Sequence, residues 1–214
     1  MKSNIHKTMK TRTILTAFCL TALLVGAAHA NQEQLAASMK ETRLEAGRTR
    51  DQLVATLATL TALTKQEKGD LRPAYQAYCA EIPKTEAAAA STRARVAFMQ
   101  GDGLKYFEGW QKTVDSINNE SLRKKSQKRL DAVKKSYVKV TASFQDAAEK
   151  FKPFLADLGD IQKVLSTDLT ASGVKGLRST VSDANWRYKT VNRTINDALD
   201  EMKKMEKSLS TEAK

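Results

Sequence analysis

A heptad pattern of apolar residues between Leu122 and Leu169 constrains this chain more than any other feature of its sequence. The apolar positions are spaced alternately three and four residues apart, over five heptads: Leu130, Val133, Tyr137, Val140, Phe144, Ala147, Phe151, Phe154, Leu158, Ile161 and Leu165. This spacing is typical of a helix that buries one narrow stripe against partner helices. The pattern therefore predicts one long helix within an elongated helical scaffold.

Three more heptad stripes cover most of the remaining chain. Together the four stripes predict helices over about residues 32–68, 71–117, 121–169 and 172–209. The connections between them are short, which makes consecutive helices antiparallel neighbours. We therefore predict an all-α fold, in which residues 31–214 form a single elongated antiparallel four-helix bundle built from coiled-coil hairpins.

Local signals refine these helices. The stripe of the first helix is rich in Thr and Ala, so its seam is thin, and a second copy of the chain could complete it. Pro83 and Pro153 lie inside predicted helices whose heptad phase continues past them, which predicts bends rather than breaks. We expect Ser121 to cap the third helix, and Thr170 or Ser172 to cap the fourth.

The first thirty residues have the pattern of a secretory signal peptide. Basic residues precede an apolar run over residues 14–25, which the sequence Ala28-His29-Ala30 follows. The run is shorter than the roughly 20 apolar residues that a membrane-spanning helix needs. We expect cleavage before Asn31, and export to the periplasm or the exterior as a soluble protein.

Removal of this segment would exclude several chemistries. It would take away His6 and His29, the two histidines of the chain, and leave Cys79 as the one cysteine. Without histidine, Ser-His-Asp and Cys-His nucleophilic sites and His-containing zinc sites are excluded. The carboxylates, for example Asp146 and Asp157, lie among lysines at helical spacing, which is typical of surface ion pairs. We therefore expect no enzyme, and no catalytic, cofactor or metal site.

The register of the helices predicts one projecting end. The chain carries a net charge of +12, of which the first thirty residues contribute four basic groups, so +8 remains. Residues 104–129, the hairpin tip, should extend roughly 20 Å beyond the other two helices at 1.5 Å per residue. Aromatic and basic residues gather there as a candidate binding surface: Tyr106, Phe107, Trp110, Lys112, Arg123, Lys124, Lys125, Lys128 and Arg129.

Two interpretations of the hairpin tip stay open. Aromatic side chains beside basic ones suit an anionic membrane surface or an acidic patch on an envelope protein. Alternatively, Tyr106 and Trp110 lie on the heptad seam and only close the end of the hairpin, while the charges form a solvated helix face. Trp186 is a second candidate, because it lies opposite the seam of the fourth helix and could anchor a partner or be partly buried.

Three motifs resemble a bacterial domain-of-unknown-function family of exported, coiled-coil-rich helical proteins. The motifs are Tyr106-Phe107-x-x-Trp110, Leu122-Arg123-x-x-Ser126-x-x-Arg129 and Asp168-Leu169-Thr170-x-x-Gly173-Val174. The resemblance implies a helical protein and brings no established activity or site residues.

The leading functional hypothesis is an exported helical scaffold or interaction protein of the cell envelope, which docks through the basic, aromatic hairpin tip. A periplasmic holdase chaperone for unfolded exported proteins is the alternative. Nucleic acid is not expected as a partner of an exported chain, although the positive charge would permit its binding.

Overall fold

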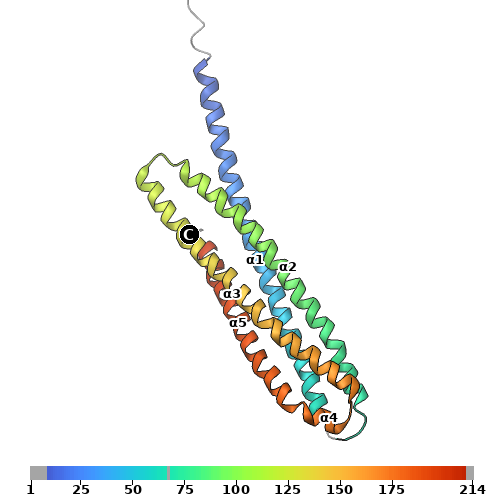
Figure 1. Ribbon diagram of the computed structural model, residues 1–214. Coiled ribbons are helices and arrows are strands. Elements are labelled where there is room, and N and C mark those ends of the chain that lie inside the picture. The colour runs from blue at the N-terminus through green and yellow to red at the C-terminus, as the bar shows by residue number, and fades with distance from the viewer. Residues whose placement is uncertain (1–8, 67, 211–214) are drawn as a thin grey trace, which may run out of the picture.

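Long helices make up almost all of the computed structural model, which describes residues 9–66 and 68–210 (Figure 1). For residues 9–29 and 210 it describes the backbone and not the side chains. The helices are α1 (Met9–Lys65), α2 (Arg72–Asp115), α3 (Glu120–Thr167), α4 (Ala171–Gly176) and α5 (Arg178–Ser210). The prediction of an all-α helical bundle is confirmed.

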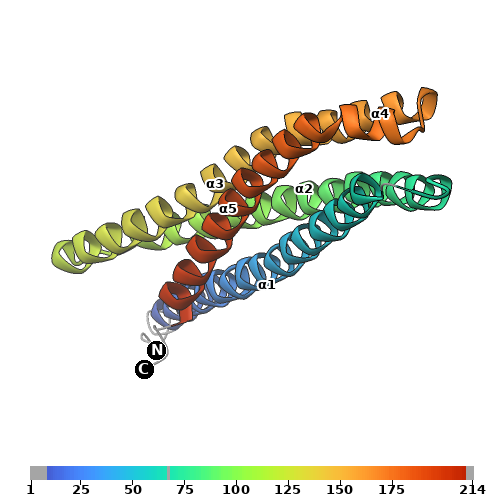
Figure 2. The same cartoon turned by 90° about the horizontal axis from the view of Figure 1, so that it is seen from below.

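The bundle consists of two helix pairs that lie side by side along one rod (Figure 2). One pair is α1 with α2, and the other is α3 with α5. Contacts between α2 and α3, and between α1 and α5, join the pairs. The short helix α4 links α3 to α5 at the end of the rod that also holds the α1–α2 turn.

The predicted heptad seam of α3 is the buried face of that helix. Every one of its positions from Leu130 to Leu165 is buried, and they are all the buried residues of α3. Apolar seams of α1, α2 and α5 complete a continuous core along the rod. Hydrophobic burial of about 25 cal/mol per Å² makes this stripe the main source of stability.

Threonine hydroxyls join α1 to α2. Thr56 and Thr85 are fully buried, and their hydroxyl oxygens lie 2.7 Å apart. Thr49 and Thr92 repeat the contact at 2.8 Å one layer further along. The seam between α1 and α2 has few large apolar side chains, and hydrogen bonds between its threonines join the two helices. These buried hydroxyls therefore have hydrogen-bond partners.

Tyrosine hydroxyls join α2 to α3. Tyr78 donates to the carbonyl oxygen of Leu158 at 2.7 Å, and Tyr137 donates to that of Met99 at 2.9 Å. Burial, together with the Asp102 carboxylate, raises the pKa of Tyr137 to about 12. Its hydroxyl therefore remains a hydrogen-bond donor at any physiological pH.

The turns agree in part with the local predictions. Gly69 has a φ of +93°, which glycine adopts without strain. Thr170 caps α4 as expected, since its hydroxyl accepts a bond from the backbone N–H of Gly173 at 3.0 Å. The prediction of Ser121 as the cap of α3 is wrong: Asn119 accepts from the N–H of Leu122 at 3.1 Å.

Helix boundaries differ from the predictions at two places: α1 begins at Met9 and not near residue 32, and the predicted fourth helix is divided. The predicted fourth helix is divided at Leu177 into α4 and α5. There the N–H of Leu177 donates a hydrogen bond to the carbonyl oxygen of Val174, three residues earlier, at 3.2 Å. By contrast, α2 and α3 continue through Pro83 and Pro153, so neither proline breaks its helix.

The amino-terminal segment lies largely outside the described part of the chain. Of the predicted signal peptide, residues 1–8 are outside the described residues, and residues 9–29 are described only as the backbone of α1. Within the described residues, no helix combines the length and the apolar character that crossing a membrane requires.

Candidate interaction surface

The hairpin tip is formed by the end of α2, the start of α3 and the turn between them (Figure 1). On the α3 side, the four-helix region reaches Arg129, which donates to the carbonyl oxygen of Ser208 at 2.8 Å. Closer to the turn, α2 and α3 contact each other through the amides of Gln111 and Gln127, which lie 2.9 Å apart. The predicted overhang is therefore present on the α3 side.

On the α2 side, α1 accompanies the hairpin further than predicted. Gln34 donates to the carboxylate of Asp102 at 2.9 Å. A Cβ placed on Gly109 would lie 3.3 Å from the side-chain nitrogen of Asn31. Among the described side chains, α1 therefore accompanies α2 at least as far as Gly109, further along α2 than the predicted limit near Leu104.

The aromatic part of the predicted surface faces inward. Tyr106 and Phe107 are buried, and the ring of Phe107 packs 5.2 Å from that of Tyr137 on α3. The Tyr106 ring lies 5.5 Å from that of Trp110, which is half-buried against the core. The burial of Tyr106 agrees with the interpretation in which seam residues close the end of the hairpin, and Phe107 is buried beside it, so neither ring forms part of an exposed surface. The Phe107 ring fills the space between α2 and Tyr137 of α3.

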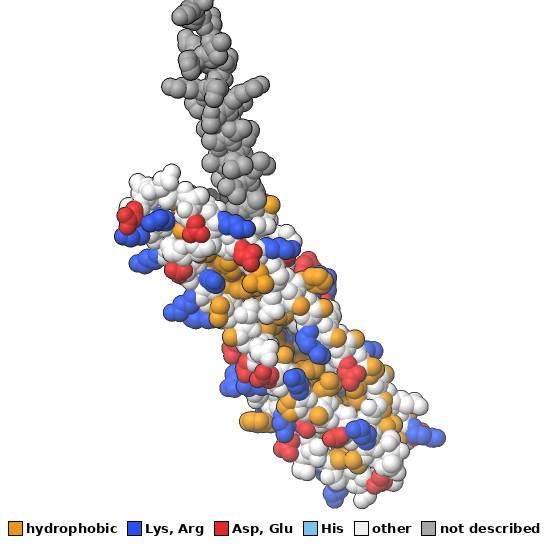
Figure 3. Space-filling view, turned by 45° about the horizontal axis from the view of Figure 1, so that its top comes forward, with side chains coloured by type: hydrophobic (Ala, Val, Ile, Leu, Met, Phe, Trp, Pro, Cys, Tyr) orange, Lys and Arg blue, Asp and Glu red, His pale blue; other side chains and the backbone are white. Residues whose placement is uncertain are grey.

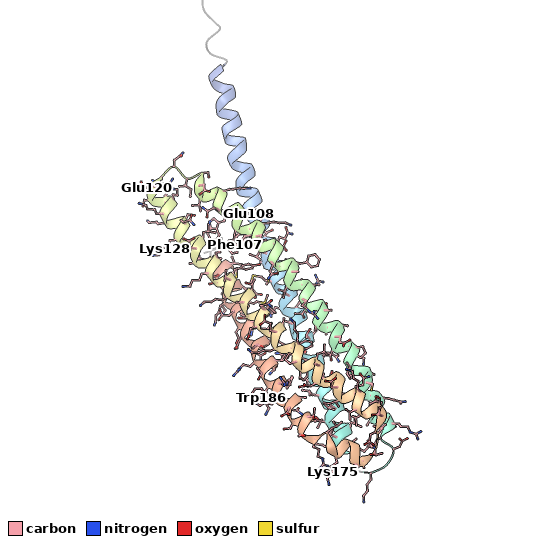
Figure 4. All side chains as sticks on the ribbon, viewed as in Figure 1. Phe107, Glu108, Glu120, Lys128, Lys175 and Trp186 are labelled. Carbon is pink, nitrogen blue, oxygen red and sulfur yellow. The ribbon has the colours of Figure 1, made fainter. Side chains whose placement is uncertain are left out.

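The basic part of the surface faces solvent. Lys112, Arg123, Lys124, Lys125 and Lys128 are all exposed, and Figure 4 shows Lys128 on α3 with Glu120 near the turn. Lys124 is paired with Glu120, at 2.8 Å between nitrogen and oxygen. Within the described residues the other four have no ion-pair partner.

Leu122 is a member of this surface that the sequence prediction omitted. Its side chain is 56 % exposed, directly before Arg123 at the start of α3. The signal that could have identified it is its position off the heptad stripe, since an apolar residue outside the seam has no helix to pack against. The exposed tip thus combines two apolar side chains, Leu104 and Leu122, with several cations that have no ion-pair partner among the described residues.

Trp186 lies far from the hairpin tip. Its side chain is 68 % exposed on α5, as Figure 4 shows toward the α4 end. The neighbouring Arg187 places its Nε 2.7 Å from Asp157 Oδ2 on α3. From Asp157 to Lys128 along α3 is roughly 40 Å at 1.5 Å per residue. The structure therefore does not bring Trp186 and the tip cations together into one site.

The described residues do not suggest a catalytic or metal centre. Among them, no three His, Cys, Asp or Glu side chains are placed so that they could hold a metal ion. Cys79 is half-buried on α2. The arrangement is suited to binding through charge and shape.

Comparison with known proteins identifies the family and no relative of established function. A search of curated proteins found no match. The family model described as protein of unknown function (DUF2959) matches residues 25–209, which is most of the chain and includes all three motifs noted above. The chain therefore belongs to the DUF2959 family.

Proposed function

We propose that this protein is an exported helical scaffold of the cell envelope that docks end-on, through its hairpin tip, to an anionic membrane surface. The observation that carries the proposal is the group of exposed cations without ion-pair partners at one end of a rod. Residues 104–129 hold seven basic and three acidic residues, a net charge of +4. Each basic residue close to an anionic membrane contributes about 1 kcal/mol of binding free energy.

The exposed side chain of Leu122 supports a membrane rather than a polar protein patch. A leucine that is more than half exposed beside Arg123 and Lys125 matches the arrangement of surface-binding segments, in which apolar groups enter the headgroup boundary and cations remain among the phosphates. The buried rings of Tyr106 and Phe107 contribute indirectly, since they hold the two helices of the tip together.

The holdase alternative has less support from the described surface. A clasp for unfolded chains needs exposed apolar side chains gathered on one face. The large exposed apolar residues lie instead on four helices: Leu44, Val54, Phe98, Leu104, Leu122, Val138, Val164 and Trp186.

Vesicle flotation tests the proposal. The protein is floated with vesicles of anionic phosphatidylglycerol or of neutral phosphatidylcholine, at low and at physiological salt. We expect binding to the anionic vesicles only, and weaker binding at the higher salt because exposed charges are screened over about 8 Å.

Two charge-reversal variants with equal net charge locate the contact. The tip variant is Arg123→Glu, Lys125→Glu and Lys128→Glu, and we expect it to stay unbound. The matched control, away from the tip, is Lys175→Glu in α4 with Lys189→Glu and Arg193→Glu in α5, three exposed cations without ion-pair partners among the described residues. If both variants lose binding equally, only net charge matters and the tip is not the docking surface; if the unsubstituted protein does not float, the membrane proposal is wrong.

A further inference from the structure

An apolar groove opens between α2 and α3 in the middle of the rod. Its volume is about 410 Å³, and side chains of α1, α2, α3 and α5 line it. Phe144 and Phe151 of α3 form one wall, and Val191 and Ile195 of α5 lie at its floor. Pockets that bind small molecules have volumes of roughly 300–1,000 Å³, so this groove is large enough for a ligand.

The groove exists because small residues occupy the seam positions at this level. Ala46 of α1 and Ala89 of α2 line it beside Thr49 and Thr92, whereas larger side chains such as Leu53, Tyr78 and Met99 are buried elsewhere in the seam. The hydrogen bonds from Tyr78 of α2 to Leu158 of α3, and from Tyr137 of α3 to Met99 of α2, join the two helices on either side of the groove.

The shape and the edge of the groove indicate the class of ligand. From Ala89 to Gln100 it extends over roughly 17 Å at 1.5 Å per residue, about half of the ~30 Å hydrocarbon thickness of a bilayer and so close to one acyl chain. Arg93 of α2 and Lys152 of α3 line it and are exposed, and neither has an ion-pair partner among the described residues.

The two cations are the charged side chains among the described residues that line the groove. The described residues that line the groove include neither Asp nor Glu. In Figure 3, hydrophobic side chains form a broken band along the rod, with Lys and Arg side chains beside it. An anionic group attached to an apolar chain would satisfy both features.

We propose that this groove binds a single-chain anionic amphiphile of the fatty-acid type. The acyl chain lies along the groove, and the carboxylate pairs with Arg93 or Lys152. A polypeptide segment fits less well, because its backbone amides would lose water in an apolar groove without gaining partners, at a cost of roughly 1–3 kcal/mol each. The inference is independent of docking through the hairpin tip.

Calorimetric titration with a matched set of twelve-carbon probes tests the proposal. Dodecanoate, dodecanol and dodecyltrimethylammonium are titrated, below their micelle concentrations, into the purified protein. We expect dodecanoate to bind one to one, and the other two at least about tenfold more weakly, which corresponds to about 1.4 kcal/mol.

Substitutions then place the ligand. Ala148→Leu fills the groove from the α3 wall, and its control, Ala132→Leu, adds the same side chain at an exposed position of α3 outside the groove lining. We expect Ala148→Leu to weaken dodecanoate binding at least about tenfold and Ala132→Leu to leave it unchanged. Circular dichroism verifies that both variants fold.

A pair of charge variants separates this site from the hairpin tip. Arg93→Gln with Lys152→Gln should weaken the binding of dodecanoate and not that of dodecanol. Arg123→Gln with Lys125→Gln, which removes the same charge at the tip, should not affect either probe.

Three results would overturn the proposal. The first is that dodecanoate does not bind. The second is equal binding by the Ala148→Leu and Ala132→Leu variants, which would place the probe elsewhere. The third is that dodecanoate does not bind but an unfolded protein, such as reduced α-lactalbumin, does, and that Ala148→Leu abolishes the binding of the unfolded protein. That result would make the groove a polypeptide site.

Discussion

Replacing Gly103 by alanine should destabilise the bundle, although alanine is the better helix former. A Cβ at this position would clash with both Cζ and Oη of Tyr137. That ring has little room to retreat, because it is buried, packs 5.2 Å from Phe107, and donates its hydroxyl to Met99.

The magnitude follows from three opposing contributions. Overpacking of a filled core costs roughly 1–3 kcal/mol. Displacement of the ring leaves the buried hydroxyl without its acceptor, at a further cost of roughly 1–3 kcal/mol. The gain in helix propensity from glycine to alanine is about 1 kcal/mol. We expect Gly103→Ala to lower the free energy of unfolding by about 3 kcal/mol, equivalent to a fall in Tm of roughly 6–12 °C for a chain of this size.

Thermal and urea unfolding followed by circular dichroism measure this change against a close control. Gly101 lies two residues away on the same helix, and a Cβ there would meet no atom within 4 Å. Gly101→Ala should therefore raise the stability by up to about 1 kcal/mol. In a Tyr137→Leu background, which lacks the clashing atoms, Gly103→Ala should no longer destabilise. Equal stability of the Gly103→Ala and Gly101→Ala variants would refute the packing of Tyr137 over Gly103.

Three further predictions concern tyrosine ionisation, the threonine contacts and the tryptophans. Burial raises the pKa of Tyr137 from 10.0 to about 12. As the pH rises, the unfolded chain therefore loses the Tyr137 proton before the folded chain does. The contribution of the protonated Tyr137 to folding stability is complete below pH 10 and declines by up to about 3 kcal/mol as the pH rises to 12. Urea unfolding across this range should show a smaller decline for Tyr137→Phe, and an unchanged slope would contradict the assignment. Thr56→Val should cost about 1 kcal/mol in urea unfolding, whereas Thr56→Val with Thr85→Val should recover part of that loss, because neither side of the contact then buries a hydroxyl; additive losses would argue against the contact. In single-tryptophan variants, acrylamide should quench Trp186 strongly and Trp110 weakly, and the reverse order would contradict their exposures.

The apolar stripe of α3 shows what could be predicted from the sequence. Its positions from Leu130 to Leu165 were all expected in the core, and all are buried. Periodicity succeeds here because a helix surrounded by several partners must bury whichever face carries its apolar residues. The same reasoning applied to α5 identified Val191 and Met202 as core residues, which they are.

The candidate surface shows where periodicity was insufficient. The spacing placed Tyr106 on a seam, but it did not decide whether a seam residue near the end of a hairpin is covered. In the structure, Phe107 packs against Tyr137, and the rings of Tyr106 and Phe107 are both buried. The exposed character of Leu122 likewise depends on how far the other helices extend along α3.

The threonine contacts and the groove were not predictable from one helix at a time. A heptad count recognises Thr56 and Thr85 as seam positions but does not show that their hydroxyls meet at 2.7 Å. Similarly, Ala46 and Ala89 are ordinary small residues in separate stripes until the bundle places both in the lining of one groove. The total side-chain volume at one level of the bundle depends on which residues of the four helices meet at that level, and this is known only from the structure.

The sequence by itself determined the helical class, the approximate extent of α2 and α3 and the apolar face of each long helix, because these depend on short-range spacing along one chain. Only the tertiary structure decided which tip residues face solvent, which hydroxyls pair between helices, and where the core is left unfilled. These features depend on the relative register of four helices, which is set by contacts between residues as distant as Gln32 and Leu209. The exposed cations of the hairpin tip and the groove between α2 and α3 both follow from that register.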